Sequence, residues 1–210
     1  RSIEQRSQLL AGVSHDLRTP LTRLKLQFEL IAPSPEVEDA KRDLKEMEET
    51  LDEYLAFAKG QAEETPAQVD VGALANEVAA EAQRAGAEVA VECAGDVTTP
   101  GRARGLKRCV ANLIDNAAAH GDRVQVGVSG EQNAVTVTVD DNGPGIPADQ
   151  YEDAFRPFSR LDATRSRNQK GVGLGLSIAR DVARSHGGDI ALSPSPLGGL
   201  RATLRIPRPA

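Results

Sequence analysis

The chain contains little that would point to a membrane span, a structural metal or a nucleic acid. Its 210 residues include only two cysteines, and its formal net charge is −6. An acidic protein is not expected to bind nucleic acid, because nucleic-acid phosphates attract basic surfaces. No window holds the ~18 apolar residues that a membrane span requires. Cys93 and Cys109 lack metal-ligand spacing and suggest no disulfide framework, which suits a reducing, cytoplasmic compartment.

The N-terminal segment carries apolar residues at steps of three and four, which predicts an amphipathic helix. This stripe consists of Leu10, Val13, Leu17, Leu21, Leu24, Phe28 and Ile31. In the following sequence "APSPEVED", Pro33 ends this helix, while Ser34 fits the N-cap and Pro35 the first position of the next helix. The pattern therefore predicts a helical hairpin.

A second apolar stripe completes the hairpin. It consists of Val37, Ala40, Leu44, Met47, Leu51, Tyr54 and Ala58, and Gly60 ends it. A lone hairpin cannot bury both stripes, so two copies are expected to form a four-helix bundle, which makes the protein a homodimer. Because the chain begins at Arg1 inside a helical pattern, with no signal peptide, we also expect a longer protein whose membrane anchor is absent here.

After a polar linker at 61–68, the segment 69–210 mixes strands and helices. Strands are expected at 69–71, 87–93, 123–129, 134–140, 189–195 and 199–207, and helices at 72–86, 102–121 and 174–188. Because the two types do not alternate strictly, the order favours an α/β sandwich over a doubly wound sheet. The predicted fold class is α+β, with a helical hairpin (1–60) in a dimeric four-helix bundle followed by an α/β sandwich (69–210).

His15 and Pro20 are unusual residues for the first helix. Heptad positions place His15 near the middle of the outward face, beside Asp16 and one turn before Thr19. Pro20 cannot donate an amide hydrogen to the carbonyl of Asp16, so the helix should bend or loosen there. A solvated histidine beside a tolerated kink is one explanation. The other is a nucleophile, because a neighbouring carboxylate can hold one ring nitrogen protonated and leave the other free to attack.

Two glycine-rich turns suggest what such a histidine would attack. They are "DDNGPGIP" (140–147) and "KGVGLGLSIA" (170–179), and the second leads into a helix whose free amides favour phosphate oxygens. The second turn lacks the GK[ST] ending of a P-loop and does not follow a strand, so a Rossmann crossover is not expected either. Asn112 and Asn116 lie one turn apart on the preceding helix, and their uncharged oxygens suit Mg²⁺ that phosphates already hold.

These residues resemble the cytoplasmic part of bacterial sensor histidine kinases, and look closest to the osmosensing EnvZ type. "SHDLRTPLT" is similar to the H box of that family, "NLIDNAAAHG" to its N box, "DDNGPGI" to its G1 box, "FRPF" to its F box and "GVGLGLSIA" to its G2 box. The similarity covers essentially all of the chain, and the five boxes occur in the family's order. It implies a dimeric phospho-acceptor domain joined to an ATP-binding domain of the gyrase, Hsp90 and histidine kinase type.

The resemblance implies that His15 attacks the γ-phosphate of ATP and that Asp16 orients the imidazole and takes up its proton. An aspartate in the receiver domain of a response regulator would then accept the phosphoryl group. The family's phosphatase motif, met here by Asp16 and Thr19, implies that the protein also dephosphorylates this partner. An upstream sensor and anchor would place the full-length protein in the bacterial inner membrane.

The resemblance also implies a nucleotide site with ATP and Mg²⁺. Its residues would be Asn112, Asn116, His120, Asp141, Gly143, Gly145, Ile146, Lys170, Gly171, Gly173, Leu174, Gly175 and Leu176. Asn116 would be the main Mg²⁺ ligand with Asn112 beside it, and Asp141 would accept a hydrogen bond from the adenine amino group. Residues 147–170 would form a lid, with Phe155 and Phe158 packing at its base.

One departure keeps an alternative open. Many relatives carry a basic residue three positions after the second asparagine, where this chain has Ala119; Arg160, Lys170 or His120 could replace that phosphate contact. A catalytically inactive scaffold that dimerises and binds a regulator is therefore one rival. Another is an ATPase of the same fold that activates water, but it would need a glutamate where Asn112 stands.

Overall fold

A computed structural model of the chain describes residues 20–32, 34–42, 44, 45, 48, 64–157, 159 and 173–208. The chain divides into two compact units, Arg1–Glu64 and Thr65–Ala210. In the part of the chain that is described, no helix is both long enough and apolar enough to cross a membrane.

The first unit contains two helical segments, 20–29 and 35–42. The first ends before Ile31, earlier than the end expected at Pro33, which lies outside the described residues. The Ser34 hydroxyl accepts a hydrogen bond from the Val37 N–H at 3.3 Å, which confirms Ser34 as the N-cap of the second segment. Leu21 and Leu44, one from each predicted stripe, are buried. The bend expected at Pro20, and the stripes before residue 20 and after residue 48, lie outside the described residues.

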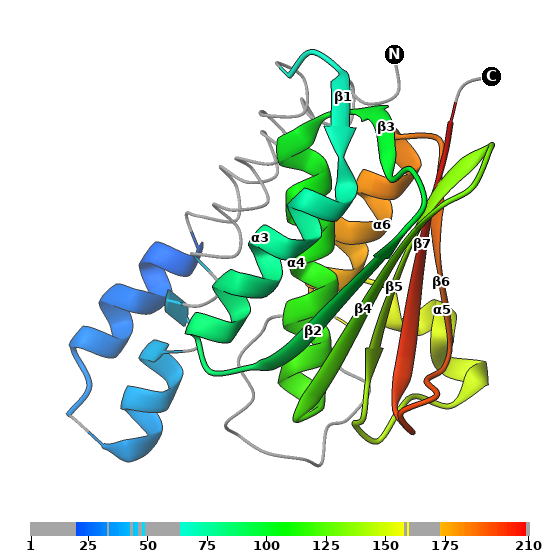
Figure 1. The fold of residues 1–210 in the computed structure, drawn as a ribbon. Helices are drawn as coiled ribbons and strands as arrows, with labels where there is room; N and C mark the ends of the chain where they lie inside the picture. Colours follow the sequence, from blue (N-terminus) through cyan, green and yellow to red (C-terminus); the bar gives the residue numbers. More distant parts are fainter. Residues whose placement is uncertain are drawn as a thin grey trace. The chain divides into compact units, whose positions relative to one another are not determined.

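The second unit contains a five-stranded sheet in the order β2-β4-β5-β7-β6 (Figure 1). Its strands are β2 (Glu88–Ala94), β4 (Arg123–Gly130), β5 (Ala134–Asp141), β6 (Asp189–Pro194) and β7 (Leu200–Pro207). β2 runs parallel to β4, and the other pairs are antiparallel. A separate two-stranded sheet pairs β1 (Ala67–Asp70) with β3 (Thr98–Gly101). This mixed order is the α/β sandwich that the sequence predicted.

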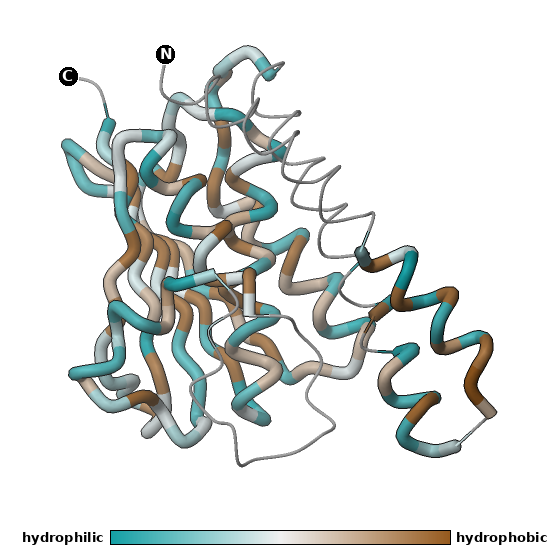
Figure 2. The backbone as a smooth tube through the Cα atoms, turned by 180° about the vertical axis from the view of Figure 1, so that it is seen from behind, coloured by the Kyte–Doolittle hydropathy of each residue, from teal (hydrophilic) through white to brown (hydrophobic). Residues whose placement is uncertain are grey.

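Three helices cover one face of the large sheet (Figure 1). They are α3 (Val71–Arg84), α4 (Ala103–His120) and α6 (Gly175–Ser185). Alternate residues of the central strands point into this layer and are buried, among them Val126, Val137 and Leu204. Brown and teal alternate along the helices in Figure 2, as expected for elements with one buried face.

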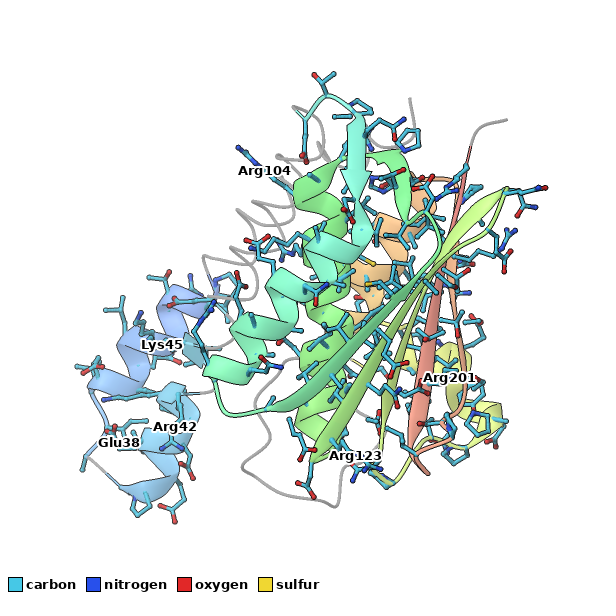
Figure 3. All side chains as sticks on the ribbon, in the orientation of Figure 1. Glu38, Arg42, Lys45, Arg104, Arg123 and Arg201 are labelled. Carbon is cyan, nitrogen blue, oxygen red and sulfur yellow. The ribbon has the colours of Figure 1, made fainter. Side chains whose placement is uncertain are left out.

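The opposite face of the sheet is more polar. Asp140 on β5 faces Arg201 on β7 in the strand register, and the guanidinium donates to both carboxylate oxygens at 2.8 Å. Asp140 is buried, whereas Arg201 is labelled at the open side of the sheet in Figure 3. Two well-placed donors satisfy the buried carboxylate, so the pair supports the register of the two central strands.

Most predicted elements are present, and the exceptions are short. The predicted strand at 69–71 begins earlier, at Ala67, and Val71 already belongs to α3, because Asp70 caps that helix by accepting from the Ala73 N–H at 2.9 Å. Ala67 and Gln68 of the expected linker are therefore in β1. The sequence pattern missed β3, η1 (Ala148–Gln150) and α5 (Tyr151–Ala154), because segments of three or four residues show no hydrophobic period.

Candidate functional site

The first glycine-rich turn leaves the sheet at the end of β5, where Asp141 is 3% exposed. Its Oδ1 accepts hydrogen bonds from the backbone N–H of Gly143 at 2.8 Å and of Leu200 at 3.1 Å. Among the described residues, no group donates to its second oxygen. The backbone thus fixes the carboxylate and leaves Oδ2 available to a ligand.

Two glycines permit the close packing around this carboxylate. A Cβ at Gly199 would lie 2.0 Å from Asp141 Oδ1 and 2.5 Å from the Gly143 nitrogen. A Cβ at Gly143 would lie 2.4 Å from the carbonyl oxygen of His120. Neither position has room for a side chain. Gly143 therefore brings the turn against the end of α4, in addition to any approach to a ligand.

Asn142 extends the contact between this turn and the chain after α4. Its Oδ1 accepts from the backbone N–H of Arg123 at 2.9 Å. Arg123, labelled in Figure 3, begins β4 directly after Gly121 and Asp122. The end of α4 and the first glycine-rich turn are thus held together by side-chain and backbone contacts.

The two predicted amides lie on α4 close to the start of α6. A Cβ at Gly175 would lie 3.8 Å from the Asn112 carbonyl oxygen and 4.0 Å from its Oδ1, so the two elements are in contact there. The Asn112 Nδ2 is buried without a hydrogen-bond partner among the described residues. Asn116 is half-buried, and its side-chain amide bonds to no described residue. Two neighbouring side-chain amides without hydrogen-bond partners in the described part of the chain, one of them buried, are suited to bind a polar ligand. Their oxygens are suited to Mg²⁺ that is bound to phosphates.

The second glycine-rich turn ends at the N-terminus of α6. Leu174 and Leu176 are 7% and 8% exposed, so their side chains belong to the core and only their backbone can face a ligand. The Ser177 hydroxyl donates back to the Leu174 carbonyl at 2.8 Å. The first N–H groups of a helix have no intrahelical acceptor, so this end can receive an anion.

Four of the other predicted nucleotide-binding residues lie in the described part of the chain. His120 is the exposed last residue of α4, and Ile146 is half-buried in the first turn. Gly145 and Gly173 have positive φ values of 70° and 75°. Lys170 and Gly171 lie outside the described residues, as do Arg160, Phe158 and the predicted catalytic residues His15, Asp16 and Thr19.

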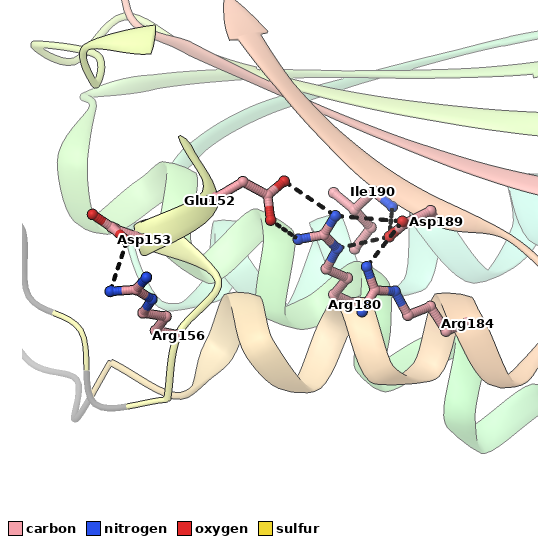
Figure 4. A network of polar contacts seen from close by, with 7 residues as sticks. All are labelled: Glu152, Asp153, Arg156, Arg180, Arg184, Asp189 and Ile190. Carbon is pink, nitrogen blue, oxygen red and sulfur yellow. Dashed lines mark hydrogen bonds and ion pairs between the residues drawn. The ribbon is translucent and has the colours of Figure 1, made fainter. Parts of the chain in front are cut away.

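A group of four residues joins α5, α6 and β6, and of these only Phe155 was singled out from the sequence. We call it the Arg180 cluster: Glu152 and Phe155 from α5 and its end, Arg180 from α6, and Asp189 at the start of β6. Figure 4 shows its three charged members. The Arg180 guanidinium donates to both oxygens of Glu152, at 2.9 and 3.3 Å, and through Nε to Asp189 at 2.8 Å. It also lies 4.2 Å from the centroid of the Phe155 ring.

The charged groups of this cluster lower the pKa of its two carboxyls. Burial alone would raise the pKa of Asp189, but hydrogen bonds from Arg180, the Ile190 N–H and Arg184 outweigh burial and lower it to about 2. The hydrogen bonds from Arg180 also lower the pKa of Glu152. Both carboxyls are therefore ionised at neutral pH and remain paired with the arginine.

Sequence reasoning missed this cluster and the role of Gly199. Arg180 occupies one of several charged positions on an amphipathic helix, and its partners come from elements far along the chain. The local signal for Gly199 was the doublet of Gly198 and Gly199 at the start of the strand expected at 199–207. It indicates a turn, but it does not reveal that the turn approaches Asp141.

Comparison with known proteins adds two family matches. Residues 5–63 match the His Kinase A (phospho-acceptor) domain. Residues 101–210 match the family described as Histidine kinase-, DNA gyrase B-, and HSP90-like ATPase. Both matches lie in the order that the sequence motifs predicted.

Individual relatives agree with these matches. Over 209 residues, 99% of this chain, the sequence is 40% identical to the sensor histidine kinase GtrS of Pseudomonas aeruginosa, of which it spans 43%. The ATP binding domain of PrrB from Mycobacterium tuberculosis superposes with a TM-score of 0.59 at 31% identity, covering 69% of this chain and 98% of that one. The histidine kinase domain of the Escherichia coli osmosensor EnvZ gives a TM-score of 0.55 at 32% identity, covering 70% and 92%.

The low pKa of Asp189 predicts an acid-dependent loss of stability. Since the pKa lies below its ordinary value of 3.8, the ion pairs of Asp189 stabilise the fold fully above that value and are lost as pH falls towards 2. Asp189→Asn should therefore be less stable than the wild type at about pH 6, and the difference should shrink between about pH 4 and 2. Urea unfolding at several pH values measures this. Asp153→Asn, which loses only a pair with Arg156, is the control, and a difference that stays constant with pH would contradict the prediction.

Proposed function

The chain belongs to the family of histidine kinase-, DNA gyrase B- and HSP90-like ATPases and carries the phospho-acceptor domain of sensor histidine kinases, and from this premise we propose a two-step phosphoryl transfer. In the first step the protein phosphorylates His15 from Mg·ATP. In the second it transfers the phosphoryl group to an aspartate of a response regulator. The observation that carries the proposal is the presence of both family domains in one chain, the first of which includes His15.

The domain boundaries that we propose follow the sequence patterns. Residues 1–60 form the dimerisation and histidine phosphotransfer domain, and a linker follows from residue 61. The catalytic ATP-binding domain begins with β1 at Ala67, two residues before the expected boundary at 69. All four large apolar side chains that are exposed in the described residues lie in the first of these, namely Leu24, Leu26, Leu30 and Ile31. Of these, Leu24 and Ile31 belong to the predicted stripe, and their exposure supports a homodimer in which a second hairpin covers them.

The proposed chemistry of the first step is a direct displacement. A ring nitrogen of His15 forms a bond to the γ-phosphorus, the bond between that phosphorus and the bridging oxygen breaks, and ADP leaves. Asp16 orients the imidazole and takes up its proton. Because the histidine belongs to the first domain and the nucleotide to the second, binding and transfer depend on separate residues.

The nucleotide site that we propose uses the geometry around Asp141 and α6. The free Oδ2 of Asp141 accepts from the adenine amino group, and the N-terminus of α6 receives the phosphates. Asn116, with Asn112 beside it, would hold Mg²⁺ through amide oxygens. Bound Mg²⁺ would neutralise charge on the phosphates during transfer.

Two further parts of the proposal concern the longer protein. This chain spans 43% of GtrS and 48% of the Escherichia coli sensor histidine kinase CpxA, which share 40% and 31% identity with it. We place the full-length protein in the bacterial inner membrane, with an upstream sensor region and this segment in the cytoplasm. We also assign it phosphatase activity towards its regulator, with Thr19 holding the attacking water.

His15→Gln should abolish phosphorylation of the protein and leave its affinity for ATP nearly unchanged, because the two functions lie in separate domains. Incubation with radiolabelled Mg·ATP and measurement of acid-labile, alkali-stable phosphate tests the first expectation, and calorimetric titration tests the second. The same assay separates a kinase from an inactive scaffold and from an ATPase that releases phosphate. Equal loss of binding and phosphorylation would count against the assignment.

Asp141→Asn should weaken ATP binding by about 1–3 kcal/mol, because the adenine amino group would lose its side-chain oxygen acceptor. Gly199→Ala should weaken it too, since its Cβ would displace the Asp141 carboxylate. Gly198→Ala is the matched control: its φ of 104° strains the backbone, but a Cβ there meets no atom within 4 Å. If the Gly198 and Gly199 variants bind ATP equally well, the carboxylate position is not what determines affinity.

Thr19→Ala should leave phosphorylation of His15 and transfer to the regulator largely intact, because Thr19 takes no part in the attack on ATP. Dephosphorylation of the regulator should slow by about 10²-fold, if positioning of water is the main role of the hydroxyl. Time courses with the phosphorylated regulator measure the rate, and Thr19→Ser, which keeps a hydroxyl, is the control. Equal rates for wild type and Thr19→Ala would remove the phosphatase assignment and leave the kinase assignment in place.

A further inference from the structure

The Arg180 cluster connects the elements that follow the two glycine-rich turns. The chain leaves the first turn at Pro147 and passes through η1 into α5, which carries Glu152. The second turn leads into α6, which carries Arg180 five residues after Gly175. At the helical rise of about 1.5 Å per residue, Arg180 lies about 7.5 Å along α6 from its start. A link between Glu152 and Arg180 therefore joins the two sides of the nucleotide site at short range.

We propose that Arg180 is a positioning residue for the nucleotide site, which fixes the spacing between the two glycine-rich turns by holding α5 against α6. The inference rests on the proposed function, because it assumes that the nucleotide binds between these two turns. Among the described residues, the Arg180 side chain bonds to Glu152 and Asp189 and lies over Phe155, and it bonds to no residue of either turn. It acts through α5, and through the helix to which it belongs.

The short length of α5 makes such a link necessary. α5 has four residues, and a single turn of helix does not form stably without tertiary contacts. Its described contacts with α6 include the two hydrogen bonds that Arg180 donates to Glu152 (Figure 4). They also include the guanidinium over the ring of Phe155 at the end of α5. Phe155 is 9% exposed. One side chain thus gives α5 both a charged and an aromatic contact.

Asp189 fixes Arg180 from the sheet side. Its carboxylate accepts from Arg180 Nε at 2.8 Å and Nη2 at 3.4 Å, and it lies at the first residue of β6. The Arg180 side chain is 15% exposed, and two carboxylates bind its planar fork. An arginine held in this way has little rotamer freedom. It therefore fixes the position of α5 relative to α6 and to the start of β6.

The chain offers one control residue on α6 and one on α5. Arg184 lies one turn after Arg180 on α6, also pairs with Asp189, at 3.2 Å, and is 55% exposed, but no bond joins it to α5 among the described residues. Asp153 lies beside Glu152 on α5 and pairs with Arg156 of its own segment. Arg184→Ala and Asp153→Ala therefore remove comparable charges without removing the link between the two elements.

The test measures binding of Mg·ADP by titration calorimetry, so that it does not depend on phosphoryl transfer. Arg180→Ala and Glu152→Ala should each raise the dissociation constant by about tenfold, and the double variant should raise it no further, because both remove one link. Arg180→Lys should fall between wild type and Arg180→Ala, since an ammonium keeps the charge but not the fork. Arg184→Ala and Asp153→Ala should stay within about twofold of wild type.

Thermal unfolding of each variant separates positioning from folding. The Glu152 side chain is 79% exposed, so Glu152→Ala should keep the melting temperature of the wild type and still weaken ADP binding. This variant also carries the test if Arg180→Ala fails to fold. Additive effects of the Arg180 and Glu152 substitutions, or equal effects of Glu152→Ala and Asp153→Ala, would overturn the proposal. Wild-type protein that binds ADP without phosphorylating His15 would instead contradict the proposed function and leave this test intact.

Discussion

Two backbone N–H groups from different parts of the chain, those of Gly143 and Leu200, donate to one carboxylate oxygen of Asp141. This arrangement ties the end of β5 to the start of β7, and the Gly199 N–H adds a bond of 3.1 Å to the Asp141 carbonyl oxygen. The carboxylate is buried, so loss of the two donors to Oδ1 would destabilise the fold. The same bonds fix the direction of the remaining oxygen. Stability of the sheet and orientation of the proposed adenine acceptor therefore depend on one constraint.

The sequence predicted the long elements and the site residues that lie within motifs. Hydrophobic periodicity and terminal glycines placed α4 and α6 close to their observed bounds, because Gly121 and Gly187 follow them directly or within two residues. The pattern "DNGPG" singled out Asp141 and its glycines. It did not reveal that Gly143 is confined by the His120 carbonyl, because that contact joins a turn to the end of a helix 23 residues earlier in the chain.

The Arg180 cluster could not be predicted for the same physical reason. Its three charged members come from α5, α6 and β6, and their partnership depends on how these elements pack. Arg184, with the same charge one turn away, differs from Arg180 chiefly in its neighbours and its exposure. Local patterns give the composition of a helix face, whereas the position of α5 on that face decides which arginine binds it. Tertiary contacts of this kind are the part of a site that sequence motifs omit.

Direct localisation of the phosphate tests the central claim of a phosphorylated histidine. After incubation with Mg·ATP, trypsin should release residues 7–18, "SQLLAGVSHDLR", which contain His15 together with Ser7 and Ser14. The account predicts that mass spectrometry finds one added phosphoryl group on this peptide, that fragmentation assigns it to His15, and that brief acid treatment removes it. A phosphoryl group that survives acid and maps to Ser14, or an unmodified peptide from protein that has bound ATP, would contradict the account.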